Sequence, residues 1–182
     1  MEKNKEKVKC IIINSNILFS SLIKEDGFTR AALLVLKNTS NVKLLIPNTV
    51  VNEFKINLSE ISRKSGLSSK NVLITFEKLL ENVERLNELD LKDEIKEGIK
   101  YVKDEKDTPF VAVALKYRPA YILTYNVKDY KKEKLEKLDI LVVTPKDALS
   151  SIGVEELEVK TKNKRKKNLL YYFAKLKMFM KK

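Results

Sequence analysis

The stretch VKCIIINSN, residues 8–16, decides the fold class of this chain. Its first part is mostly apolar or β-branched and ends at Asn14, which predicts a strand buried on both faces, as in a parallel sheet. A helix is expected to follow over 15–23. Further strands are expected at 42–46, 121–124 and 140–143, and further helices at 29–36, 49–65, 68–86, 92–102, 108–117, 128–135 and from 144 onward. Strands alternating with helices predict an α/β fold, a three-layer α/β/α sandwich with a central parallel sheet.

The composition is that of one globular domain with a basic extension. Of 182 residues, 43% are hydrophobic and 34% are charged, which suits a single packed core. The 37 lysines and arginines exceed the 25 acids, giving a net charge of +12, and residues 160–182 hold ten basic residues and no acid. We therefore expect a domain over 1–152 and a basic tail over 153–182. A strongly positive charge favours an anionic partner such as nucleic acid.

The tail combines this charge with a helical repeat. Apolar residues recur at helical spacing and predict an amphipathic helix: Leu169, Tyr172, Phe173, Leu176 and Met180. Three roles remain open for it: docking on its own domain or on a second subunit, contact with RNA, or contact with a membrane surface. Contact with RNA is expected at Lys164, Arg165, Lys166 and Lys167.

Missing residue types exclude several kinds of chemistry. The chain has no histidine, so it can form neither a Ser-His-Asp or Cys-His triad nor a histidine zinc site. Its single cysteine, Cys10, excludes an intramolecular disulfide and a thiolate zinc cluster. Four scattered glycines cannot build a glycine-rich nucleotide loop. Neither a signal peptide nor a run of roughly 18 apolar residues is evident, so a soluble, cytoplasmic protein is expected.

Polar and acidic side chains follow the predicted strands, at the end where a parallel sheet usually carries its active site, and two more acids, Asp104 and Asp107, lie at the start of the helix before the third strand. They come from four separate segments: Asn14, Ser15 and Asn16; Glu53; Asp104 and Asp107; and Thr124, Asn126 and Asp129. Because the carboxyl ends of parallel strands share one edge, these side chains are expected to converge, and their oxygens suit a hard ion such as Mg²⁺ or Mn²⁺. Purely structural roles stay open as well. Asp107 can cap the next helix, and Asn126 and Asp129 fit an ordinary turn after a strand.

Four segments carry a resemblance to a known family. They are IIINSNILFSSLI (11–23), PNTVVNEF (47–54), DEKDTPFVAVAL (104–115) and YILTYNVKDY (121–130). In this order they resemble the PIN domain, the nuclease fold that includes VapC-type toxins and rRNA-processing endonucleases. The resemblance covers roughly residues 8–150. It implies that acids at these places bind one or two Mg²⁺ or Mn²⁺ ions, which activate water for attack on an RNA phosphodiester.

The resemblance also implies a role for each matching residue. The implied catalytic set is Asn14, Glu53, Asp104, Asp107, Asn126 and Asp129. The implied metal ligands within it are Asn14, Glu53, Asp107 and Asp129. Asn16 and Thr124 match small polar residues that orient ligands or a phosphate. Apart from the resemblance, Tyr125 and Tyr130 are candidates for stacking on RNA bases.

One position departs from the family pattern. Where Asp-Thr-Asn is usual, this chain has Asn14-Ser15-Asn16, which removes a negative charge and predicts weaker ion binding and water activation. Both a deliberate inactivating change and a natural substitution explain this difference. The functions left open are an endoribonuclease, attenuated or not, an RNA-binding or scaffold protein that has lost catalysis, and the toxin of a toxin–antitoxin pair. The expected partners are RNA, an antitoxin or a ribosome-associated protein, and a second copy of the chain, with no membrane.

Overall fold

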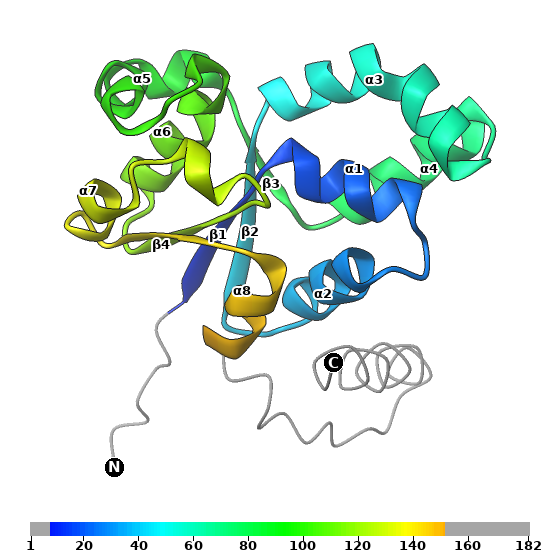
Figure 1. Ribbon diagram of the computed structural model, residues 1–182, viewed down its shortest axis with the longest axis horizontal. Helices are drawn as coiled ribbons and strands as arrows, with labels where there is room; N and C mark the ends of the chain where they lie inside the picture. The colour runs from blue at the N-terminus through cyan, green and yellow to red at the C-terminus, as the bar shows by residue number, and fades with distance from the viewer. Residues whose placement is uncertain (1–7, 152–182) are drawn as a thin grey trace.

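A five-stranded, all-parallel sheet forms the centre of the structure, a computed structural model that describes residues 8–151 (Figure 1). The strands lie in the order β3-β2-β1-β4-β5. Their bounds are β1 Lys9–Ile13, β2 Val42–Pro47, β3 Glu84–Leu86, β4 Ala120–Leu123 and β5 Ile140–Val143. β1 pairs with a neighbour on each side, and Ile11, Ile12 and Ile13 are fully buried. This burial on both faces explains why the strand is apolar without alternation.

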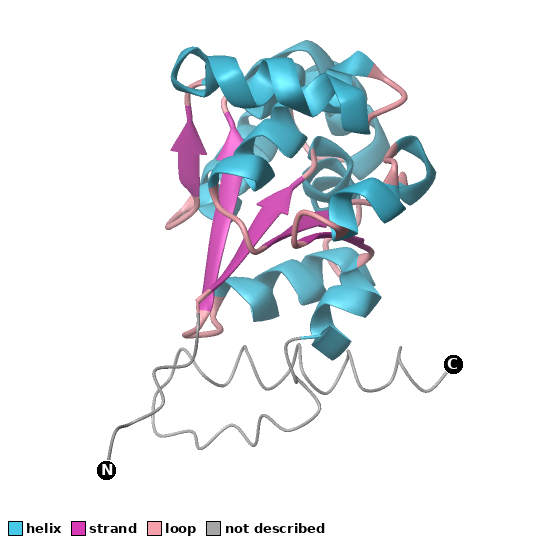
Figure 2. Ribbon diagram, turned by 90° about the vertical axis from the view of Figure 1, so that its left-hand side faces the viewer, coloured by secondary structure: helices cyan, strands magenta, loops and turns pink. Residues whose placement is uncertain are grey.

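Helices cover both faces of this sheet (Figure 2). The α-helices are α1 Ser15–Ile23, α2 Phe28–Lys37, α3 Thr49–Ser65, α4 Ser69–Leu80, α5 Lys92–Gly98, α6 Thr108–Lys116, α7 Lys132–Glu136 and α8 Pro145–Ser151. Short 3-10 turns are η1 Glu88–Leu91, η2 Ile99–Tyr101, η3 Glu105–Asp107 and η4 Val127–Asp129. α6 packs on β1, β2 and β4 from one side, whereas α2 packs on β2, and α8 on β4 and β5, from the other. The predicted three-layer α/β/α sandwich is confirmed.

The predicted helix over 68–86 is wrong in its second half. α4 ends at Leu80, Asn82 turns the chain with a φ of 62°, and the edge strand β3 follows. Only Leu86 of β3 is buried, so this strand lacks the alternation of apolar and polar residues that predicts one. Its parallel pairing with β2, a contact distant in sequence, makes it a strand.

Two other predicted helices divide. The segment 92–102 forms α5 and then η2, and 128–135 forms part of η4 and then α7. The remaining predicted helices and strands agree with the structure to within one residue at each described end. The predicted boundary at 152–153 and the basic tail, with its run at 164–167, lie outside the described residues. No helix within 8–151 is long and apolar enough to cross a membrane.

The position of α3 matters for the site, because this helix carries Glu53. Phe54 and Phe76 stack with ring centroids 3.7 Å apart and planes 6° apart, and both side chains are buried. This contact joins α3, which also packs on α1, to α4. α3 ends at Gly66, whose φ of 72° is the left-handed conformation that glycine adopts without strain.

Candidate active site

The carboxyl ends of the strands open onto a cleft of about 430 Å³. Its lining comes from the start of α1, from α3, from η3 and α6, and from the loop after β4. The lining residues are Asn14, Ser15, Asn16, Glu53, Ile56, Asn57, Asp104, Lys106, Asp107, Phe110, Asn126 and Asp129. The structure therefore brings together all six predicted catalytic residues and Asn16. Thr124 does not line the cleft.

Asn14 occupies the inner end of the cleft and is only 4% exposed. It follows β1 and caps α1, because its Oδ1 accepts a hydrogen bond from the backbone N–H of Asn16 at 3.1 Å. Its Nδ2 donates to Asp107 Oδ1 at 2.9 Å and to the Tyr130 hydroxyl at 3.0 Å. The two requirements fix the amide orientation, since a backbone N–H needs an acceptor and a carboxylate needs a donor. The amide nitrogen, rather than the oxygen, therefore faces Asp107.

Tyr130 completes this arrangement. Its hydroxyl donates to Asp107 Oδ1 at 3.0 Å, and its side chain is 3% exposed. A β-bridge between Val102 and Tyr130 joins the loop after β4 to the segment that precedes Asp107. The suggestion that Tyr130 stacks on RNA bases is wrong, because the ring is buried. Sequence spacing gave no sign that this hydroxyl would meet a carboxylate.

Asp107 does not serve as a helix cap. It precedes α6, but its side chain accepts no capping hydrogen bond from that helix. Asp104 does have such a role, because its Oδ1 accepts from the backbone N–H of Lys106 at 3.0 Å and so caps η3. Asp104 is exposed at the rim of the cleft, whereas Asp107 is half-buried. Of the two acids, Asp107 is the one whose carboxylate faces the interior of the cleft.

Glu53 and Asp107 are the carboxyl groups of the cleft whose pKa values are shifted by their surroundings. Burial raises the pKa of Glu53, and the negative charge of Asp107 adds to the rise, while a hydrogen bond with Ser15 and the charge of Lys106 oppose it. Burial also raises the pKa of Asp107, against the hydrogen bonds from Tyr130 and Asn14. Within residues 8–151 neither carboxylate makes an ion pair. Two half-buried anions that make no ion pair within residues 8–151 favour a bound cation.

Thr124 and Asn16 link the ends of two strands behind the cleft. Asn16 Nδ2 donates to Thr124 Oγ1 at 2.9 Å, and Asn16 Oδ1 accepts from the backbone N–H of Tyr125 at 3.3 Å. Thr124 Oγ1 also accepts from the backbone N–H of Asn126 at 3.1 Å, and Thr124 is fully buried. These contacts align the ends of β1 and β4. The predicted contact of Thr124 and Asn16 with substrate stays a prediction.

Asn126 and Asp129 form the outer wall of the cleft. Asn126 is exposed and its side chain makes no capping bond to η4. Asp129 accepts a hydrogen bond through its backbone carbonyl from Lys103 N at 2.8 Å, and its charge contributes to the raised pKa of Asp107. The turn is therefore held by backbone groups, and the Asp129 carboxylate acts on the same site as Asp107. Tyr125 is 46% exposed, so its predicted stacking role stays a prediction.

Carboxylate and amide oxygens are the ligands that the cleft offers a divalent metal ion. In the described part of the chain no three or more Asp, Glu or Cys side chains form a group that could hold a metal ion. Mg²⁺, however, is commonly held by one or two carboxylates, with water and substrate phosphate filling its other positions. Glu53 and Asp107, both half-buried in the cleft, can supply these one or two carboxylates.

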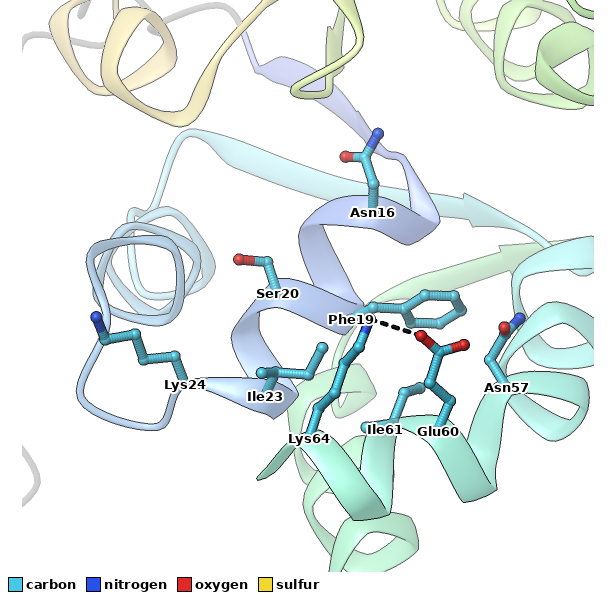
Figure 3. A pocket seen from close by; sticks show the side chains of 9 residues that line it. All are labelled: Asn16, Phe19, Ser20, Ile23, Lys24, Asn57, Glu60, Ile61 and Lys64. Atoms are coloured by element: carbon cyan, nitrogen blue, oxygen red, sulfur yellow. Dashed lines mark ion pairs between the residues drawn. The ribbon is translucent and has the colours of Figure 1, made fainter. Parts of the chain in front are cut away.

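A second hollow of about 490 Å³ adjoins the cleft between α1 and α3 and shares Asn16 and Asn57 with it (Figure 3). Its remaining lining is Phe19, Ser20, Ile23, Lys24, Glu60, Ile61 and Lys64. Lys64 pairs with Glu60, and Lys24 lies at the other end of the hollow in Figure 3.

This chain is similar to known proteins. A sequence profile of the PIN domain matches residues 12–124. A solved structure of VapBC2 from Rickettsia felis, bound to a DNA fragment from its promoter, is 16% identical over 74% of this chain and 98% of the other, with a TM-score of 0.45. No curated protein matches the chain. The profile match spans more than half of the chain, from the end of β1 through α3 to β4, and so the chain belongs to the PIN domain family.

Proposed function

We propose that this protein is a Mg²⁺- or Mn²⁺-dependent endoribonuclease, with the ion held by Glu53 and Asp107. The observation that carries the proposal is this pair of half-buried carboxylates in one cleft, without an ion pair in the described residues. When bound, such an ion supplies an activated water and neutralises charge that develops on the phosphodiester. Membership of a nuclease family supports the same chemistry.

The surrounding residues support these two carboxylates in different ways. Ser15 hydrogen-bonds Glu53, and Lys106 places a positive charge near it. Asp129 lines the same cleft and acts electrostatically on Asp107, which supports it as a further ligand. Asp104 and Asn126 lie at the rim, where contact with substrate or with ion-bound water is the role we propose. Asn14 turns its amide nitrogen to Asp107, which supports a positioning role better than ligation.

RNA is the proposed substrate on grounds of charge. The net charge of +12 favours a polyanion, and the predicted RNA contacts at 164–167 add to Lys106 in the cleft and Lys24 beside it. Binding through phosphates weakens steeply with salt.

The acidic cleft is also the face that an antitoxin would cover, if the protein is the toxin of a VapC-like pair. The homodimer, the ribosome-associated partner and a cytoplasmic location are proposed on the family resemblance.

A second function, RNA binding without cleavage, is favoured by one observation. The amide of Asn14 neutralises part of the Asp107 charge by hydrogen bonding, where an acid would strengthen ion binding. A protein of this kind would bind RNA tightly and cleave it neither with nor without a divalent ion.

Cleavage of labelled single-stranded RNA by the full chain separates the two functions. With Mn²⁺ we expect cleavage that EDTA stops, and we expect Glu53→Gln to slow it about 100-fold or more, because a lost metal contact removes several kcal/mol of transition-state stabilisation. Glu77→Gln, the same change on an exposed residue of α4, is the matched control and should cleave like the parent. Equal cleavage by Glu53→Gln would show that the site is wrongly assigned, and binding without cleavage by the parent would favour the second function.

A further inference from the structure

Asp107 is held through one of its two carboxylate oxygens. Oδ1 accepts from Asn14 Nδ2 at 2.9 Å and from the Tyr130 hydroxyl at 3.0 Å, so both donors converge on that one oxygen. No side chain within residues 8–151 donates a hydrogen bond to Oδ2. The carboxylate is thus fixed in rotation, with a single oxygen left for another ligand.

Both N–H groups of the Asn14 amide are used inside the cleft. One N–H of its amide goes to Asp107 and the other to the Tyr130 hydroxyl. Its Oδ1 accepts from the backbone N–H of Asn16, with the Ser15 hydroxyl at 3.4 Å. Asn14, Tyr130 and Asp107 therefore form a closed ring of three hydrogen bonds at the inner end of the cleft.

The backbone around Tyr130 keeps this ring in place. Lys103 N donates to Asp129 O at 2.8 Å, and Lys131 N donates to Tyr101 O at 2.8 Å, one bond on each side of Tyr130. With the β-bridge to Val102, these bonds tie the loop after β4 to the segment that leads into η3. They fix the backbone position from which the buried Tyr130 side chain reaches Asp107.

We propose that Tyr130 and Asn14 are positioning residues that clamp Asp107, so that Oδ2 alone of its oxygens binds a divalent cation. The inference rests on the proposed function, because it assumes that Asp107 serves a cation. It implies a site for one ion, shared between Asp107 Oδ2 and Glu53. On the other side of Asp107 lie two neutral hydrogen-bond donors, Asn14 and Tyr130, in place of a further acid. Tyr130 touches neither ion nor substrate and acts through Asp107.

Mn²⁺ binding to the full chain without RNA, measured by titration calorimetry, tests the clamp separately from catalysis. Tyr130→Phe removes only the hydroxyl, and we expect Mn²⁺ affinity to fall about tenfold or more, as it does when other hydrogen-bond partners of metal ligands are removed. Tyr117→Phe is the matched control. It removes a tyrosine bond to a carboxylate at Glu84, 2.7 Å long and outside the cleft, and should leave the affinity unchanged.

A second variant covers the case in which Tyr130→Phe folds poorly. Asn14→Ser keeps an oxygen that can cap α1 but loses the donor to Asp107, so it should lower Mn²⁺ affinity in the same way. Combining the two changes should cost less than the product of their separate effects, because they act on one oxygen. Unchanged or increased affinity in both single variants would overturn the inference, as would a parent chain that binds no Mn²⁺. RNA cleavage lost in Glu53→Gln while these affinities stay unchanged would overturn the clamp and leave the proposed function standing.

Discussion

Replacing Asn14 with aspartate should make the folded protein depend on a divalent cation. Nδ2 of Asn14 lies 2.9 Å from Asp107 Oδ1, so the change removes a hydrogen bond to a charged group, worth about 1.5–3 kcal/mol. It also places a second carboxylate oxygen at that distance. Two unit charges there repel by about 6 kcal/mol at an effective dielectric constant of about 20.

Uptake of a proton limits this loss. Protonating a carboxyl group of ordinary pKa, about 4, costs about 4 kcal/mol at pH 7, which is less than the repulsion. In the Asn14→Asp variant the two carboxyl groups should therefore share one proton near neutral pH. We expect a loss of about 3–4 kcal/mol in EDTA, which lowers Tm by about 6–16 °C for a chain of this length.

Thermal unfolding of the full chain in EDTA and in Mn²⁺ measures the effect. Mn²⁺ at about 100 times its Kd should return about 2.7 kcal/mol to the variant, and Mn²⁺-dependent RNA cleavage should become faster than in the parent. Asn126→Asp makes the same change on an exposed residue of the same cleft and should alter stability by no more than about 0.5 kcal/mol. A variant as stable as the parent in EDTA would refute the placement of the amide nitrogen against Asp107.

Two further predictions concern pH and charge. Because burial raises the pKa of Glu53 and Asp107, the folded state holds protons that the unfolded chain has released, so these groups lower stability as pH rises above about 4. The Tm difference between Glu53→Gln and the parent in EDTA should therefore increase from pH 4 to pH 7, and a decrease would contradict the burial of this carboxylate. Lys24→Gln, beside the cleft, should weaken binding of single-stranded RNA in anisotropy titrations by about two- to fivefold at low salt. Lys137→Gln, in a hollow beside Pro119, is the control, and an equal loss there would mean that binding follows net charge alone.

Local patterns account for most of the fold. The apolar run that ends at Ile13 predicts a strand because it must be buried on both faces, and the polar residues after it predict the helix start. β3 was predicted to be the end of a helix, because its strand conformation depends on pairing with β2 rather than on its own residues. The approximate place of Glu53 and Asp107 was also predictable, since both follow from the topology of a parallel sheet.

Residue types and their local order were enough to predict a parallel α/β sheet and acids at its carboxyl edge, and to exclude histidine and disulfide chemistry. Which atoms meet in the cleft depends on contacts between segments that are distant in the chain. Asn14 reaches Asp107 and Tyr130 across separations of 93 and 116 residues, and the direction of its amide depends on the backbone N–H that its oxygen must satisfy. A contact of this kind leaves no periodicity in the chain, because hydrogen-bond geometry between distant segments exists only once the sheet has brought them together.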